Sequence, residues 1–441
     1  MCRCTHLSEP IQNVMEQIPF EPAEPKLALE QLPRAPAVFA LYGAAAKDEP
    51  YIGRTPNLRG RLERLLQPSA KHPRRLQLAG RVRRIAWRLT GSEFESLLAQ
   101  FSLLEDVYGA KALERMHLRA PAFVRYLGGN PYPRIVVTNK PSLREAEWAY
   151  GPFASRAAAE RFAEEALKLF LLRRCTDDLN PDPNHPGCVY SEMKMCLAPC
   201  YKGCTDERYA EEAGAVQNFL ATRGESKLVV LRSERDAASA NLAFEDAAAL
   251  HAQVQKVEAV RALAPELVQP MSRLRAVVLQ ASTKPDEVAV FLFEGGRLRG
   301  PVAFSIIGMR IQNEQSGSSS LFAQPLALEP VPEAVVSDQL SVVSHGSAEP
   351  RDSASAKIPR TMLEARMETV LADLGKDVGS APSATVRQAH LARLKRWYYR
   401  PEVKREGEIC FPDHTGHWQI KSILRGVGRV AAKSLAHAPR M

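Results

Sequence analysis

The stretch at residues 50–62 reads PYIGRTPNLRGRL, and an apolar segment, PAVFAL, precedes it at residues 36–41. These segments predict a short strand, a small loop, a second strand through Tyr51-Ile52-Gly53, and then a helix. The helix is basic, with Arg54, Arg59 and Arg61 close together. Such a cluster at the end of a strand suggests a site that handles phosphate, and it raises the question of whether the chain cuts DNA or only holds it.

The size and charge of the chain limit what it can be. With 441 residues it is too long for one core, so about two to four domains are expected. Its net charge of +9 favours an anionic partner, with nucleic acid first. The sequence has neither a long apolar run nor the pattern of a secretory signal at its start. We therefore expect a cytoplasmic protein with no membrane partner.

Hydrophobic periodicity and composition divide the chain into segments of a multi-domain α+β protein. An alanine-rich stretch predicts two antiparallel helices, an alternating stretch predicts strands, and a Ser/Pro/Gln/Glu-rich stretch predicts disorder. The expected order is a flexible N-terminus (1–30), a small α/β domain (31–128), a cysteine-cluster segment (129–224), a helical hairpin (225–263), a short β region (264–310), a low-complexity linker (311–385) and a basic tail (386–441).

Five of the eight cysteines fall within thirty residues. The first four are Cys175, Cys188, Cys196 and Cys200, separated by twelve, seven and three residues, and Cys204 follows. In a reducing compartment such crowding indicates a metal centre instead of a disulfide framework. Four thiolates can hold an iron–sulfur cluster or a tetrahedral zinc ion, and their spacing does not decide between the two.

Several motifs together resemble one family. In order, they are PAVF, YIGR, NLRGRL, SEFESLL, YGPFASRAAAERF, LRRC, CLAPC and LAFEDAAALHAQV. Over residues 33–306 this series is similar to the UvrC subunit of bacterial excision-repair nucleases. The resemblance implies a 4Fe-4S cluster on the first four cysteines, with zinc as the alternative, and it leaves Cys204 outside the ligand set.

The same resemblance implies a GIY-YIG nuclease fold for residues 31–128. Tyr51 then corresponds to the YIG tyrosine that acts as base, and Arg61 to the helical arginine that contacts the phosphate. Arg54 replaces a lysine that is common in the family. In such a site a helical glutamate holds one divalent ion, Mg²⁺ or Mn²⁺, which stabilises the leaving oxygen.

Other positions depart from the family pattern. Phe39 stands in place of the GIY tyrosine, Val124 in place of an asparagine, and Gln100 in place of the metal-binding glutamate. A hard divalent ion loses most of its attraction when its one protein ligand is neutral. Glu93 lies two helical turns from Gln100, about 10 Å along the axis, which is too far to substitute. Metal binding should therefore be badly weakened.

The helical hairpin resembles the UVR motif, which implies docking on a UvrB-like helicase subunit. Phe244, Ala247, Ala248 and Val254 are expected to form its apolar seam, with Glu245 beside them. His251 stands where the family usually has arginine. Periodicity alone supports a hairpin that packs only on itself, without a partner, as well as it supports a docking hairpin.

Three further features bear on DNA. An arginine-rich surface is expected from Arg54, Arg59, Arg61, Arg64, Arg74, Arg75, Arg81, Arg83 and Arg84. GVGRVAAKSL, with Gly426 and Gly428, has the form of one helix-hairpin-helix, or of a turn before an ordinary helix. LKRWYYR could stack on bases or fill a small core, and the core reading is preferred.

Because only about 130 residues follow Ile307, we expect no complete ribonuclease-H-like domain, which makes the second cut in UvrC relatives. Two hypotheses remain. The first is a scaffold that grips DNA and docks on the helicase subunit. The second is an active endonuclease that makes a single incision.

Overall fold

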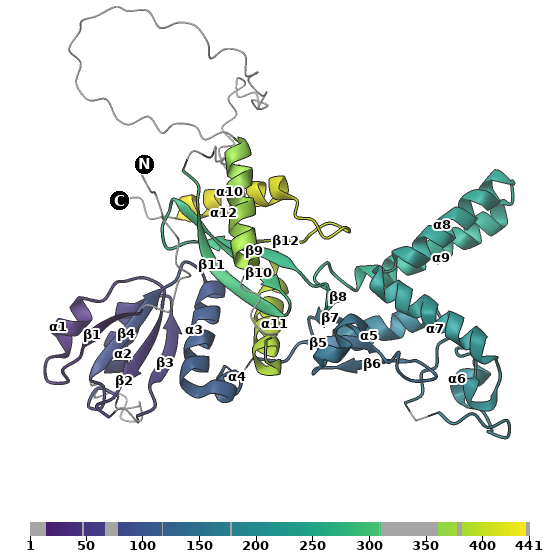
Figure 1. The fold of residues 1–441 in the computed structure, drawn as a ribbon, viewed down its shortest axis with the longest axis horizontal. Helices are drawn as coiled ribbons and strands as arrows, with labels where there is room; N and C mark the ends of the chain where they lie inside the picture. Colours follow the sequence, from purple (N-terminus) through teal and green to yellow (C-terminus); the bar gives the residue numbers. More distant parts are fainter. Residues whose placement is uncertain are drawn as a thin grey trace, which may run out of the picture.

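The structure, a computed structural model, describes residues 15–437 except 46–47, 67–77, 117, 177–178, 308, 310–359 and 377–381. It contains three four-stranded sheets, ordered β1-β4-β2-β3, β6-β5-β7-β8 and β11-β10-β9-β12. We call the units built on them the N-terminal, middle and C-terminal units. The C-terminal unit lies between the other two, so the last part of the chain joins the first two parts (Figure 1). The mixed α and β architecture confirms the predicted fold class.

The N-terminal unit begins earlier than the sequence predicted. Strand β1 pairs with β4, and Phe20 and Leu29 are fully buried, so residues 16–30 are not a flexible arm. Its sheet is antiparallel, with β3 at an edge. Its elements are β1 (Glu16–Pro19), α1 (Pro25–Glu30), β2 (Ala37–Tyr42), β3 (Tyr51–Thr55), α2 (Leu58–Leu66), β4 (Arg84–Leu89), α3 (Glu93–Tyr108), η1 (Gly109–Lys111) and α4 (Ala112–Arg115).

Helix α3 is the element that links the N-terminal unit to the rest. It starts at the Ser92 cap, whose hydroxyl accepts a hydrogen bond from Glu95 N. Ala99 and Leu103 pack on one face of the N-terminal sheet, whereas Phe94 and Leu98 pack into a core shared with the middle and C-terminal units. Burial on several sides explains why the helix is apolar almost all round.

The middle unit also begins earlier than predicted. Strand β5 pairs with both β6 and β7, so the expected boundary at residue 128 falls inside this sheet. Val124 is therefore a buried core residue of the middle sheet and not a position of the nuclease-like site. Its elements are β5 (Ala122–Tyr126), β6 (Ile135–Thr138), η2 (Leu143–Trp148), β7 (Ala149–Phe153), α5 (Arg156–Leu167), α6 (Val189–Glu192), η3 (Pro199–Tyr201), α7 (Asp206–Ala221) and β8 (Gln269–Pro270).

Helices α8 (Glu225–Ala240) and α9 (Phe244–Ala262) form a hairpin that projects from the middle unit (Figure 1). Val254, Val257 and Val260 are buried along α9. Phe244, which was expected to take part in docking on a partner, is 64% exposed at the start of α9. No helix among the described residues has the length and apolar character to span a bilayer.

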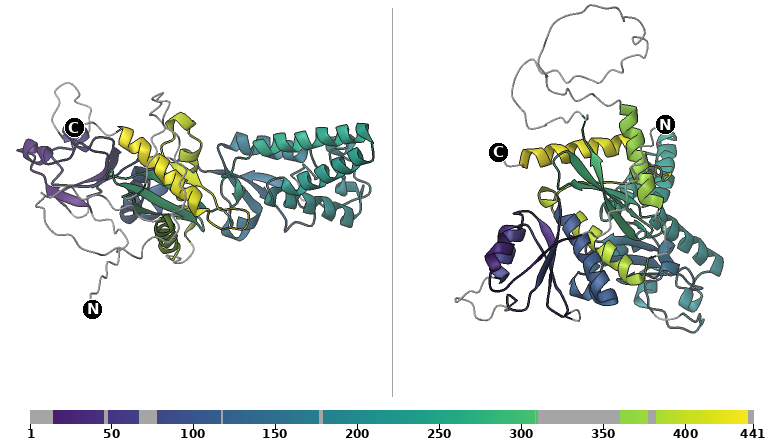
Figure 2. Two further views of the ribbon diagram at one scale, coloured as in Figure 1. Left: turned by 90° about the horizontal axis from the view of Figure 1, so that it is seen from above. Right: turned by 60° about the vertical axis from the view of Figure 1, so that its left-hand side comes forward.

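The C-terminal unit includes part of the expected linker and the expected tail, whereas residues 311–359 of the predicted linker lie outside the described residues. Helix α10 lies inside the predicted linker, and Met367 and Leu371 on it are buried against the C-terminal sheet. The views in Figure 2 show α10 and α12 lying on this sheet. Its elements are β9 (Ala276–Ala281), β10 (Glu287–Glu294), β11 (Arg297–Ser305), α10 (Arg360–Lys376), α11 (Ala384–Tyr398), η5 (Glu402–Lys404), β12 (Glu408–Cys410) and α12 (Ile420–His437).

The helix-hairpin-helix prediction is wrong. Gly426 and Gly428 lie inside the continuous helix α12, where the backbone amides are used within the helix, so they cannot form a phosphate-binding turn. A Cβ at Gly426 would lie 2.9 Å from both Leu279 Cδ1 and Glu408 Oε2. The glycine therefore lets α12 approach the sheet closely.

The aromatic run of α11 serves the core, as preferred from the sequence. Trp397 is 3% exposed, its ring centroid lies 5.4 Å from that of Phe94 on α3, and its Nε1 donates to the carbonyl of Glu406 at 2.8 Å. The Tyr399 hydroxyl donates to the carbonyl of Pro152 in the middle unit at 2.9 Å. Helix α11 thus joins all three units.

His390 on α11 makes the stability of the folded chain depend on pH. Burial, then Arg393 and Arg297, lower the pKa of His390 to about 3, and its Nδ1 accepts from Leu298 N at 2.9 Å. The folded chain keeps this imidazole neutral down to about pH 3, whereas the unfolded chain protonates it below about 6.5. The contribution of His390 to stability is thus complete above about pH 6.5 and is lost as the pH falls toward 3.

We expect His390→Asn, whose amide oxygen can accept the same hydrogen bond, to flatten the pH dependence of the unfolding free energy between pH 4 and 6.5 by about 1.4 kcal/mol per pH unit. Urea unfolding at several pH values measures this slope. His251→Asn, on the exposed face of α9, is the control and should keep the wild-type slope. Equal slopes in the wild type and His390→Asn would show that His390 is protonated in the folded chain.

Candidate nuclease-like site and cysteine centre

The N-terminal sheet separates the residues expected at the nuclease-like site onto its two faces. Tyr51 packs with Phe39 on the face covered by α2, with ring centroids 6.1 Å apart. Phe39 is buried opposite Gly53, where a Cβ would come within 2.7 Å of the Phe39 ring. The glycine of the YIG motif therefore makes room for Phe39. Within the described residues, the side chains of Tyr51 and Arg61 have no hydrogen-bond or ion-pair partner.

Arg54 lies on the opposite face, toward α3. Its Nη1 is 3.3 Å from Glu93 Oε1, and the Nη2 of Arg400, at the C-terminal side of α11, is 2.8 Å from the same oxygen. The hydrogen bond from Arg400 does most to lower the pKa of Glu93, and the charge of Arg54 adds to it. Glu93 is thus held as an anion by two guanidinium groups.

Gln100 is half-buried on α3, two turns beyond Glu93. Its amide cannot replace the charge of a carboxylate ligand. Glu95, the next acidic residue, is buried, and its carboxylate accepts from Gly91 N at 2.8 Å. Among the residues that the structure describes, no group of three or more His, Cys, Asp or Glu side chains could hold a metal ion. The residues around Tyr51 therefore do not fit a catalytic Mg²⁺ or Mn²⁺.

Several of the arginines expected to bind DNA contact the protein's own backbone. Arg59 donates to the carbonyls of Leu32 at 2.7 Å and Glu30 at 2.5 Å, which ties α2 to the end of α1. Arg64 donates to Gly60 at 2.9 Å, and Arg83 donates to Gly80 at 2.9 Å and Val82 at 2.8 Å. The charges of Arg64 and Arg83 remain exposed. Arg74 and Arg75 lie outside the described residues.

The four cysteines come together in the middle unit, in a loop system between α5 and α7. The charge states of Cys175, Cys188 and Cys200 each influence Cys196, whereas Cys204 responds to Asp206 and Arg208. Arg173 Nη1 lies 3.6 Å from Cys175 Sγ, and Ala198 N donates to Cys196 Sγ at 3.3 Å. Ala198 itself has a φ of 57°, which turns the backbone amide toward the sulfur. Arg173 and Ala198 thus place an N–H group beside two of the four sulfurs.

Burial raises the pKa of Cys196 to about 11, and it also raises the pKa of Cys200. The neighbouring thiols add to both shifts. At neutral pH these groups are therefore protonated unless a cation binds them, and binding must release their protons. As placed, the sulfurs are not gathered closely enough for a single ion, although they interact with one another.

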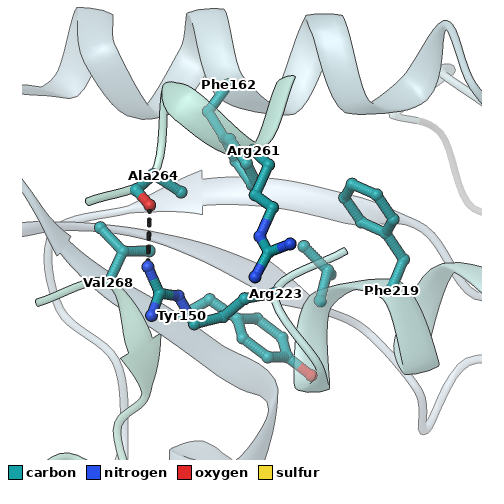
Figure 3. Close-up of a pocket in the computed structure, with 8 residues that line it drawn as sticks. Tyr150, Phe162, Phe219, Arg223, Arg261, Ala264 and Val268 are labelled. Carbon is teal, nitrogen blue, oxygen red and sulfur yellow. Dashed lines mark hydrogen bonds between the residues drawn. The ribbon is translucent and has the colours of Figure 1, made fainter. Parts of the chain in front are cut away.

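A small pocket marks the base of the helical hairpin (Figure 3). There Arg223, which follows α7, donates to the carbonyl of Ala264 beyond α9 at 3.3 Å, and Arg261 donates to Glu225 at 2.7 Å. Burial lowers the pKa of Arg223. The two arginines fix the hairpin to the middle unit, and the apolar walls around them offer no reactive group.

A family model described as the UvrC/Cho excinuclease middle domain matches residues 123–219, which run from β5 through most of α7 and include all four clustered cysteines. Over these residues the chain is similar to the UvrC family. This placement confirms the resemblance seen in the sequence.

Curated relatives support the same placement. The chain is 28% identical over 238 residues to UvrABC system protein C of Alcanivorax borkumensis, covering 54% of this chain and 39% of that protein. The protein of the same name in Carboxydothermus hydrogenoformans is 26% identical, over 64% of this chain and 46% of its own length. The one in Oleidesulfovibrio alaskensis is 29% identical, over 69% and 41%. This UvrC relative thus spans less than half the length of these proteins. No solved structure matches.

Sequence reasoning missed Arg400 as a partner of Glu93. The two residues are 307 positions apart, and only the packing of α11 on α3 brings them together. Arg400 ends the LKRWYYR motif, which indicated a core in this segment but gave no sign that its last arginine reaches α3.

Proposed function

We propose that this UvrC-like chain is a repair-associated scaffold that binds DNA and a UvrB-like helicase subunit and has lost the ability to cut. The observation that carries the proposal is the state of the two acidic positions on α3. Position 100 is a neutral amide, and Glu93 is paired with Arg54 and Arg400. A phosphodiester cut needs a cation to stabilise the leaving oxygen, and neither position supplies a ligand for it.

The binding half of the proposal rests on charge and exposure. The net charge of +9 and the exposed charges of Arg64 and Arg83 favour a polyanion. At the free end of the hairpin, Leu242 is 72% exposed and Phe244 is 64% exposed. Exposed apolar side chains next to each other on a projecting element are typical of a docking surface.

For the cysteine centre we propose a 4Fe-4S cluster held by Cys175, Cys188, Cys196 and Cys200, with zinc as the alternative. The thiols of Cys175, Cys188 and Cys200 each act on Cys196, so the four sulfurs lie in one neighbourhood, as a four-thiolate centre requires. Bound there, the cluster would hold the loops between α5 and α7 in place. Cys204 lies outside this set.

An active single-incision endonuclease remains the second candidate, and one observation favours it. Within the described residues Tyr51 and Arg61, the base and phosphate ligand of that reading, are without partners. Groups that wait for a substrate would look the same.

Docking can be tested with Phe244→Asp. If Phe244 contacts the helicase subunit, a buried carboxylate at its place should weaken binding at least tenfold, since truncating a central aromatic contact costs about 2 kcal/mol or more. Calorimetry with a purified UvrB protein measures the affinity. Val229→Asp is the matched control, because Val229 is 58% exposed near the base of the hairpin on α8. Equal affinity for both variants would place the docking surface elsewhere.

A further inference from the structure

A cavity of about 510 Å³ lies between the middle unit and the start of α11. The loop that follows β6 forms one side, with Lys140 and Arg144, and the first turns of α11 form the other, with Arg387. Of the residues that line it in the described part of the chain, three are cationic and none is acidic. The cavity therefore has a strongly positive lining, and neither the nuclease-like site nor the cysteine centre includes it.

Arg387 is the feature that calls for a ligand. The residue is only 5% exposed, its Nη2 donates to the carbonyl of Pro141 at 3.4 Å, and its Nη1 has no partner among the residues that the structure describes. A Cβ on Gly296 would lie 2.9 Å from Arg387 Cγ and Cδ, so the turn between β10 and β11 fixes the stem of the side chain. A buried guanidinium with an unused donor is costly unless an anion compensates it.

The N-terminus of α11 adds to the positive electrostatic potential in the cavity. The helix has fifteen residues and begins at Ala384, which lines the cavity. The Ser383 hydroxyl caps only Val386 N. The positive end of the helix dipole and the remaining free amides of the first turn therefore lie beside Arg387. Such an arrangement is a ready site for phosphate.

The volume of the cavity and its apolar lining residues indicate a ligand larger than a bare ion. Its volume is within the usual range for small-molecule sites, about 300–1,000 Å³. Pro121, Phe123 and Leu391 form its apolar part. A ligand that combines a phosphate with a flat apolar group suits both halves.

We propose that this cavity binds the phosphate of a nucleotide, either within a DNA strand or free, with Arg387 and Lys140 as its ligands. As a site for a strand it rests on the proposed DNA binding and extends it to the junction of the middle and C-terminal units. As a site for a free nucleotide it is independent of that function.

The test uses the full chain and fluorescence anisotropy with a labelled single-stranded 12-mer, followed by competition with adenosine monophosphate and inorganic phosphate. We expect Arg387→Gln and Lys140→Ala each to weaken strand binding about tenfold and to reduce the slope of log K against log salt by about one. Arg156→Gln, an exposed arginine paired with Glu160 on α5, is the control and should bind like the wild type. Thermal melting checks folding, and Lys140 is exposed, so its variant keeps the test valid if Arg387→Gln does not fold.

The strand-binding and competition experiments distinguish a phosphate within a DNA strand from the phosphate of a free nucleotide. Loss of strand binding in the variants supports a strand site, and loss of mononucleotide binding alone supports a free-nucleotide site. Wild-type strand binding that neither variant changes, with no mononucleotide binding, would overturn the cavity proposal and leave DNA binding intact. Absence of strand binding in the wild type would instead count against the proposed function.

Discussion

Replacing Cys196 with serine is expected to remove the visible absorbance near 400 nm of the purified protein and to lower its Tm by roughly 10 °C or more. Binding at structural metal–thiolate centres is worth on the order of 10 kcal/mol, and much of it is folding free energy. Cys196 should be especially sensitive because burial raises its pKa to about 11 and because its sulfur accepts a hydrogen bond from Ala198 N.

Cys204→Ser is the matched control, since Cys204 lies nearby but outside the interacting set. It should keep both absorbance and stability. Metal analysis of the wild type should give about four irons per chain, whereas one zinc and no iron would decide for the alternative. If Cys196→Ser kept its metal, the assigned ligand set would be wrong.

Trp397→Ala should destabilise the chain by about 3–5 kcal/mol, which is the usual cost of removing a large buried aromatic side chain. The ring lies in the core shared by the three units, against Phe94 of α3, and its Nε1 hydrogen bond to Glu406 would also be lost. Urea unfolding of the full chain measures the change. The urea concentration at the midpoint of unfolding should fall, because α3 of the N-terminal unit loses its contact with the Trp397 ring.

Tyr399→Phe serves as the comparison because it removes only the hydrogen bond to Pro152, worth about 1 kcal/mol. If Trp397→Ala left stability unchanged but weakened DNA binding, the ring would stack on bases, as the alternative reading of LKRWYYR holds.

The fold was predictable where contacts are local and not where they are distant. Residues 225–263 form a helical hairpin because alanine-rich helices beside each other in the chain need no outside partner. Helix α11, by contrast, carries Arg387, His390 and Arg393 in buried positions. A segment with that composition resembles a solvated basic tail, and its burial depends on α3 and β11, which lie far away in the sequence.

The candidate site was predictable by residue but not by environment. The resemblance to the family was enough to show that Gln100, a neutral amide, stands in place of the metal-binding glutamate. The pairing of Glu93 with Arg400 could not be foreseen, because it depends on the end of α11 reaching α3. Val124 was assigned to the wrong unit for a related reason, since strand pairing and not chain proximity decides which sheet β5 joins.

The central claim is that the chain grips DNA without cutting it, and one incision assay tests it most directly. The full chain is incubated with a damaged plasmid, UvrB and Mg²⁺ or Mn²⁺, beside three variants, which are Tyr51→Phe, Gln100→Glu and the double variant. The account predicts an intact plasmid with the wild type, with nicking confined to Gln100→Glu and removed by the second substitution. Nicking by the wild type that Tyr51→Phe abolishes would contradict it.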